Sequence, residues 1–206
     1  MNEILLIGKK IIVDKSPMLL QYDPGEDWQN YWTVMDGEWE YDGEWLVGAE
    51  RRNRGGILFS KEQYAGNVML SFTMKTALPA TRDLNALYCA HWDENRDRLG
   101  EAYICGLNGW YEGKSGIERN YYSNLYATTS LYHYEPGTEI HMICGAIDGH
   151  NFMVVDDQMI CELVDPNPIK GGYVGFSPYC TKLQVKDVKI REIYWEPNKK
   201  TYESEF

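Results

Sequence analysis

The sequence predicts an all-β protein built as an antiparallel β-sandwich. Apolar and polar residues alternate at period two in stretch after stretch, for example over 67–76, which is the pattern of half-buried strands. Tight-turn pairs such as Asp148-Gly149 separate these stretches. No stretch keeps a helical period for more than a turn or two, and the 16 Tyr, 7 Trp and 5 Phe favour strands over helices. Strands without intervening helices indicate antiparallel sheets packed as a sandwich.

The length of 206 residues fits one sandwich domain that spans 1–206. We expect residues 1–22 to supply entry strands, since a sandwich often secures its N-terminus by pairing it with a late strand. The charged segment 196–206 is expected to be a frayed tail.

Charge and cysteine usage limit the classes of partner. The net charge of −11 argues against nucleic acid and against an anionic membrane surface, because both attract basic patches. The apolar run at 4–8 is too short for an export signal or a membrane span. The 5 cysteines are odd in number and lack C-x-x-C spacing, as expected of buried free thiols. We therefore expect a reduced, cytoplasmic protein without a membrane partner.

The clearest local signal is a predicted hairpin over 36–48. Trp39 and Tyr41 should point inward, Glu38 and Glu40 outward, and Asp42-Gly43 should form a two-residue turn. Carboxylates spaced along one strand could serve acid/base hydrolysis, and sandwich glucanases carry E-x-D-x-x-E on such a strand. Here the order is E-x-E-x-D and turn chemistry already explains the aspartate, so we interpret these carboxylates as structural.

Further strands are predicted after this hairpin, with an irregularity near Asp187 in the last of them. They cover 57–60, 67–76, 84–92, 126–134, 140–144, 152–155, 159–164, 171–176 and 183–193. The loop at 93–104 looks briefly like a calcium loop, but its sixth position is Arg98 and its twelfth is Ile104, where Gly and Glu are required. We predict no metal site.

The stretch 101–122 is the candidate functional region. It begins as a strand, in which Tyr103, Cys105 and Leu107 alternate with smaller neighbours, and then carries four glycines that predict a loop over 106–119. Aromatic, amide and charged side chains crowd between the glycines. A sugar requires this chemistry, because its CH faces stack on rings and its hydroxyls bond carboxylates and guanidinium groups. The loop is expected to fold over one face of the sandwich beside His91 and Trp92.

The candidate residues have named roles. For an enzyme, the acid/base would be Glu118 or Glu112, the proton partner His91 or Tyr103, and the stabiliser of a carboxylate or oxyanion Arg119 or Lys114. For a binding module, Trp110, Trp92 and Tyr111 would stack on the ligand, and Asn108 would bond its hydroxyls. The alternative is a packed surface loop whose aromatics cover a core edge.

The chain resembles the concanavalin A-like lectin/glucanase jelly roll from about residue 28 to residue 193. The matching pieces are DGEWEYDGEWLVG, GGILF, NVMLSFTMKT, DLNALYCAHW and GGYVGF…LQVKDVKIREI. Within that superfamily it looks most like the YesU-type bacterial family, on the motif D-[IL]-N-A-L, the mid-chain stretch GLNGWYEGKSGIERN and the glycine-rich penultimate strand. The resemblance implies a jelly roll and breakdown of pectin or other plant glycans, and it supplies no catalytic residues.

The leading functional expectation is a carbohydrate-active protein, a hydrolase or lyase, that acts on oligosaccharide fragments inside the cell at the concave face of a jelly roll. One alternative is a non-catalytic carbohydrate-binding module. Another is a structural subunit whose aromatics are buried in a homo-oligomer. The sequence contains no G-x-S-x-G, H-E-x-x-H, phosphate-binding glycine loop or dinucleotide fingerprint, so no cofactor is expected.

Overall fold

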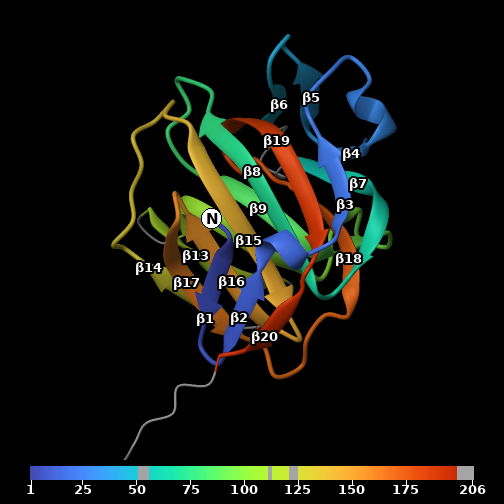
Figure 1. Ribbon diagram of the computed structural model, residues 1–206. Coiled ribbons are helices and arrows are strands. Elements are labelled where there is room, and N and C mark those ends of the chain that lie inside the picture. The colour runs from blue at the N-terminus through green and yellow to red at the C-terminus, as the bar shows by residue number, and fades with distance from the viewer. Residues whose placement is uncertain (51–55, 111–112, 121–124, 199–206) are drawn as a thin grey trace, which may run out of the picture.

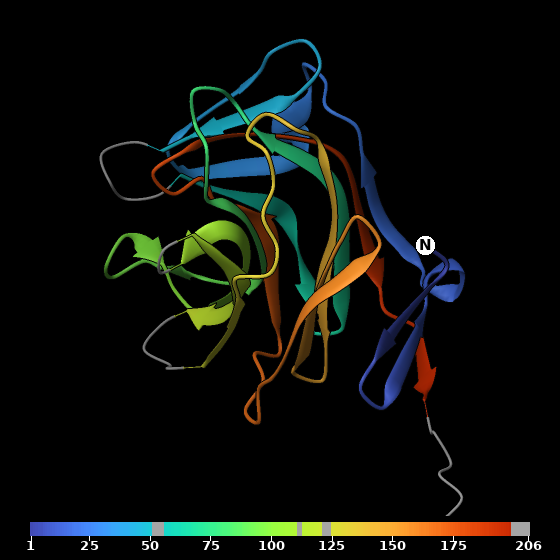
Figure 2. The same ribbon diagram turned by 90° about the vertical axis from the view of Figure 1, so that its left-hand side faces the viewer.

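Two antiparallel sheets packed face to face make up most of the molecule (Figures 1 and 2). The computed structural model describes residues 1–50, 56–110, 113–120 and 125–198. The seven-stranded sheet has the order β14-β13-β12-β9-β18-β7-β4. Its strands are β4 (Trp32–Asp36), β7 (Ile57–Ala65), β9 (Leu84–Ala90), β12 (Ala102–Trp110), β13 (Lys114–Asn120), β14 (Tyr126–Thr129) and β18 (Gly171–Phe176).

The eight-stranded sheet has the order β17-β16-β15-β8-β19-β6-β5, with β3 (Met18–Tyr22) also paired to β19. Its other strands are β5 (Glu38–Tyr41), β6 (Leu46–Ala49), β8 (Val68–Thr76), β15 (Ile140–Ile147), β16 (His150–Val155), β17 (Gln158–Val164) and β19 (Lys182–Glu192). The described residues also contain a two-stranded ribbon of β10 (Trp92–Asp93) and β11 (Arg98–Leu99), and two short 3-10 helices, η1 (Val13–Lys15) and η2 (Trp28–Asn30). None of the described helices has the length and apolarity needed to cross a bilayer.

The main core fills the space between the two sheets. Phe72 of β8 meets Phe176 of β18 edge on at 5.1 Å, and Trp32 of β4 lies 5.6 Å from Phe176, measured between ring centroids. All three rings are at most 1% exposed. Rings from both sheets therefore interdigitate, as inward-facing strand residues do in a sandwich, and the predicted all-β antiparallel sandwich is confirmed.

A small third sheet secures both ends of the described chain. It consists of β1 (Glu3–Leu6), β2 (Lys9–Ile12) and β20 (Trp195–Pro197) and lies outside the eight-stranded sheet (Figure 2). Ile4 and Ile11 pack there against Phe152 of β16. The expected pairing of entry strands with late strands is confirmed. The prediction of a frayed tail from residue 196 onward was wrong at its first residues, because Glu196 pairs with Lys10 in this sheet. Residues 199–206 lie outside the described residues.

Turn chemistry predicted most connections correctly. Asp148 and Gly149, both at positive φ, join β15 to β16 as a two-residue turn, and Asp187 has a φ of 56° where the register of β19 shifts. The first hairpin turns one position later than predicted, so that Asp42 precedes the bend instead of forming part of it. The Asp42 N–H donates to the Trp45 carbonyl, and its carboxylate accepts the Glu44 and Trp45 N–H groups, so Gly43 and Glu44 form the bend.

The predicted loop over 106–119 was wrong, because most of this segment is the β12–β13 hairpin of the seven-stranded sheet. Gly106 pairs with Gly116, and a register shift follows between Gly106 and Trp110. A Cβ on Gly116 would collide with the Ala127 carbonyl of β14, and one on Gly109 with the Asp83 carboxylate. These glycines permit close approach inside a sheet instead of breaking a strand.

Candidate functional site

The outer face of the seven-stranded sheet carries a set of aromatic rings. Phe59 of β7 and Tyr173 of β18 stack with their centroids 5.2 Å apart and their planes 9° apart. Trp92 of β10 meets Phe59 edge on at 6.4 Å. Phe59 is buried, whereas Trp92 and Tyr173 are half-buried and so present part of their surface to solvent. Partly exposed rings held by a buried ring form a rigid stacking platform.

Strand register places Glu118 on this same outer face. Glu118 of β13 pairs with Ile104 of β12, and Ile104 pairs with Leu87 of β9. Directly opposite residues project to the same side of a sheet. Ile104 and Leu87 belong to the apolar cluster that contains Phe59 and Trp92. Glu118 therefore stands at one end of a row that leads across the sheet toward the aromatic platform.

A polar centre lies at the start of β9, around Asp83 and Asn85. The Asn85 amide donates 3.0 Å bonds to Asp83 Oδ1 and to the Ser177 carbonyl. Asn85 is 5% exposed, and its Oδ1 has no hydrogen-bond partner among the described residues; the same is true of Asn108 Oδ1 on the adjacent strand. The Asp83 N–H donates to the Leu107 carbonyl, which ties this centre to β12. Both oxygens are shielded from solvent, so the half-buried Asp83 is the member of this centre that can meet a ligand.

Electrostatics distinguish Asp83 from an ordinary surface carboxylate. Burial raises the pKa of Asp83 to about 6, the Asn85 amide opposes that rise, and the charges of Glu50 and Glu118 add to it. Asp83 is thus a group that can hold a proton in mildly acidic solution while a second carboxylate lies close enough to influence it. Raised carboxyl pKa values are one mark of general acids.

Tyr103 and Arg119 lie on the opposite, inner side of the same strands. Tyr103 is fully buried, and its hydroxyl donates a 2.7 Å bond to Asp165 Oδ2. Arg119 Nη1 reaches the same oxygen at 2.7 Å, and its Nη2 reaches Glu101 Oε1 at 2.8 Å. Burial raises the pKa of the Tyr103 phenol above its usual range. These groups connect β12 and β13 to the β17–β18 connection and do not face the outer-face site.

Of the remaining candidate residues, the structure describes His91 and Lys114, while others lie outside its described residues. His91 is held by a 2.8 Å contact from Nε2 to the Gly171 carbonyl. Lys114 is half-buried at the start of β13, opposite Trp110 in the register. The side chain of Trp110 and the whole of Tyr111 and Glu112 lie outside the described residues. The predicted set is therefore divided: Glu118 and Trp92 share the outer face, and Asn108 lies beside Asp83.

The calcium-like loop is a turn of the β10–β11 ribbon. Its Asp93 carboxylate lies 3.3 Å from Arg96 and accepts the Asn95 N–H. Among the described residues, no group of three or more His, Cys, Asp or Glu side chains is placed to hold a metal ion.

Sequence reasoning missed Asp83, Asn85 and Tyr173. Asp83 and Asn85 stand inside the D-L-N-A-L motif that carried the family resemblance, yet nothing in their spacing indicated a chemical role. Tyr173 lay in the glycine-rich strand 171–176. The signal that could have found them is alternation, since Asp83, Asn85 and Leu87 share one face of β9 and its extension.

Comparisons with known proteins support the fold. No family model and no curated protein sequence matches the chain. The structure is similar to a protein of unknown function with a galectin-like fold from Bacillus subtilis, with a TM-score of 0.70 and 12% identity over 87% of this chain and 98% of that one. It is also similar to the carbohydrate-binding module CBM66 from Bacillus subtilis, with a TM-score of 0.62 and 13% identity over 78% of this chain and 94% of that one.

A further similar structure is a pseudo-β-1,3-glucanase of Mycobacterium tuberculosis, with a TM-score of 0.57 and 11% identity over 85% of this chain and 98% of that one. At these identities the likeness shows the fold and not the activity. The chain has the galectin-like, concanavalin A-like jelly-roll sandwich.

Proposed function

We propose that this protein binds a neutral oligosaccharide along the outer face of its seven-stranded sheet. The observation that carries the proposal is the sharing of one face by partly exposed aromatic rings and hydrogen-bond acceptors. Trp92 and Tyr173 supply the rings, and Asp83 and Glu118 supply the acceptors. Pyranose CH faces stack on rings while hydroxyls donate to carboxylate oxygens. The carboxylates disfavour an acidic sugar, because like charges repel.

Similar folds lend support, since one of them is a carbohydrate-binding module. The finer assignment to the YesU-type family, the action on plant-glycan fragments and the cytoplasmic location belong to this proposal. The family assignment and the plant-glycan fragments rest on the sequence motifs, and the location rests on the five cysteines without C-x-x-C spacing.

The test is binding of neutral oligosaccharides, measured by calorimetry and saturation-transfer NMR. Trp92→Ala should weaken binding at least about tenfold, because stacking on an aromatic ring is lost. Tyr194→Ala, which removes an exposed ring on the other side of the molecule, is the matched control and should bind normally. Undiminished binding by a folded Trp92→Ala variant would contradict the proposal.

Hydrolysis is the second candidate function, and the raised pKa of Asp83 favours it. In this scheme protonated Asp83 gives its proton to the leaving oxygen, and the Glu118 carboxylate takes a proton from the water that attacks the anomeric carbon. Asp83→Asn and Glu118→Gln should each abolish release of reducing ends while oligosaccharide binding persists. Turnover that survives both substitutions would exclude this mechanism, and a lack of turnover in the unchanged protein would leave a binding module.

A further inference from the structure

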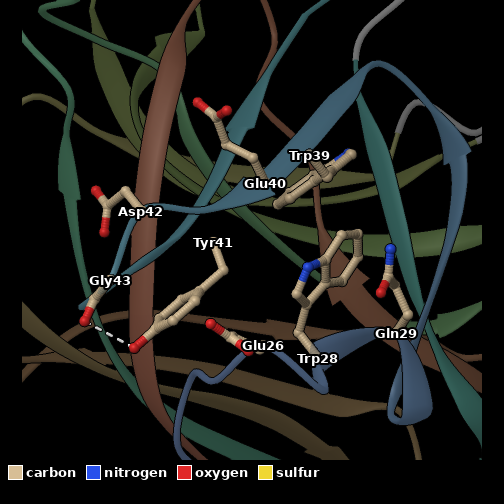
Figure 3. Close-up of a pocket in the computed structure, with 8 residues that line it drawn as sticks. All are labelled: Glu26, Trp28, Gln29, Trp39, Glu40, Tyr41, Asp42 and Gly43. Carbon is tan, nitrogen blue, oxygen red and sulfur yellow. Dashed lines mark hydrogen bonds between the residues drawn. The ribbon is translucent and has the colours of Figure 1, made fainter.

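A hollow of about 560 Å³ opens at the side of the sandwich (Figure 3). It lies between η2, which leads into β4, and the β5–β6 hairpin. β4 is an edge strand of the seven-stranded sheet, and β5 is an edge strand of the eight-stranded sheet. The hollow is lined by Glu26, Trp28, Gln29, Trp39, Glu40, Tyr41, Asp42 and Gly43. None of these residues belongs to the outer-face site.

Its aromatic walls are fixed in place. The six-membered ring of Trp39 lies on Gly48, where an added Cβ would collide with it, and Trp39 Nε1 donates a 3.2 Å bond to the Asp36 carbonyl. Trp28 is 7% exposed and belongs to the main core. The Tyr41 hydroxyl donates a 2.7 Å bond to the Gly43 carbonyl. A ligand would meet preformed ring surfaces and would not have to order them.

The polar groups around these rings include both a hydrogen-bond donor and hydrogen-bond acceptors. The Trp28 Nε1 faces the hollow in Figure 3, and no group among the described residues accepts its proton. In Figure 3 the Glu26 carboxylate lies beside Tyr41 and Trp28, and the Glu40 carboxylate stands at the opposite rim, turned away from these two rings. Glu40 has one ion pair, 3.6 Å from Lys182, and both partners are well exposed, so it is weak.

Asp42 is excluded as a ligand group by its own contacts. Its Oδ1 accepts two backbone N–H groups, and its Oδ2 accepts the Gln184 amide at 2.9 Å. Burial alone would raise the pKa of Asp42, but the hydrogen bonds from Trp45, Glu44 and Gln184 together outweigh it and lower the pKa. Asp42 therefore shapes the turn and adds negative charge at the rim.

We propose that this hollow is a second sugar-binding subsite that takes one non-acidic pyranose ring. The ring would stack on the half-buried rings of Trp39 and Tyr41, its hydroxyls would donate to Glu26 and Glu40, and one hydroxyl oxygen would accept the Trp28 N–H. A uronate or sulfated sugar would be repelled by the carboxylates, since no Lys, Arg or His lines the described hollow. An alkylammonium ion would satisfy the carboxylates and rings but would leave the indole N–H without a partner.

The test uses methyl glycosides of glucose, galactose and mannose as probes, with glucuronic acid and choline as counter-probes. Saturation-transfer NMR and tryptophan fluorescence report binding. At least one neutral glycoside should bind, and Trp28→Phe, which keeps a ring but removes the donor, should weaken that binding about fivefold. Glu26→Ala combined with Glu40→Ala should weaken it at least about tenfold, since hydrogen bonds to charged groups are stronger.

Two controls separate this subsite from the outer-face site. Glu135→Ala removes an exposed carboxylate elsewhere and should leave binding unchanged. Trp92→Ala should also leave this binding unchanged, so the two proposals can fail independently. If Trp28→Phe does not fold, the Glu26/Glu40 double variant still decides, because both side chains are exposed. The proposal is overturned if no neutral glycoside binds, if glucuronic acid or choline binds equally well, or if the signal persists in the double variant.

Discussion

Replacement of Asp165 by Asn tests whether the inner cluster around Arg119 holds the sandwich together. Asp165 is 3% exposed. Its Oδ2 accepts the Tyr103 hydroxyl and Arg119 Nη1, each at 2.7 Å, and its Oδ1 accepts the Asn167 N–H at 2.8 Å. An asparagine keeps the shape but removes the charge and turns one acceptor into a donor that faces donors. The half-buried guanidinium would then face an uncharged group.

Breaking a buried ion pair costs about 3–5 kcal/mol. Arg119 retains Glu101 at 2.8 Å and the Asn167 carbonyl at 2.6 Å, so the lower end applies. We expect a loss of about 3 kcal/mol in the free energy of unfolding by urea titration. The melting temperature should fall by about 6–12 °C, at ~2–4 °C per kcal/mol for a chain of this size.

Glu101→Gln is the control for this prediction. Its carboxylate is 51% exposed, so its bond to Arg119 should contribute less than about 1 kcal/mol. A loss below about 1 kcal/mol for Asp165→Asn would refute the reasoning, because the cluster would then be a surface network of little consequence.

Three further predictions follow from the structure. The folded pKa of Asp83 lies above its unfolded value, so the folded state binds more protons; stability should fall as pH rises from about 4 to 6, and urea titrations across that range should lose the slope in Asp83→Asn. Gly48→Ala should displace the Trp39 ring, cost about 1–3 kcal/mol and quench sugar-dependent fluorescence changes; unchanged fluorescence would contradict it. Thiol titration should find five free cysteines after denaturation, with Cys180, the exposed one, reacting first in the native protein; burial and nearby Glu50 raise the pKa of Cys180, so that reaction should be slow near neutral pH.

The sequence predicted those parts of the fold that depend on local alternation and turn chemistry. Strands such as β8 and turns such as Asp148-Gly149 are specified by residues that are neighbours in the chain. The sequence did not predict the β12–β13 hairpin, because its glycines are needed for close contacts with residues that are not their neighbours in the chain. Gly116 faces the Ala127 carbonyl of β14. The pairing of β13 with β14 that brings these two residues together is not visible in the pattern of residues next to Gly116.

The candidate site was predicted only in part, for a related physical reason. Glu118 and Arg119 are adjacent in the sequence, and a loop would allow both to meet one ligand. A strand sends successive side chains to opposite faces, so Arg119 is paired with Asp165 inside while Glu118 shares the outer face with Ile104. Trp92 and Asp83 reach that face from separate connections of the sheet. Proximity in this site is therefore set by register across β9, β12 and β13, and a sequence search for it should follow alternate residues on neighbouring strands instead of consecutive ones.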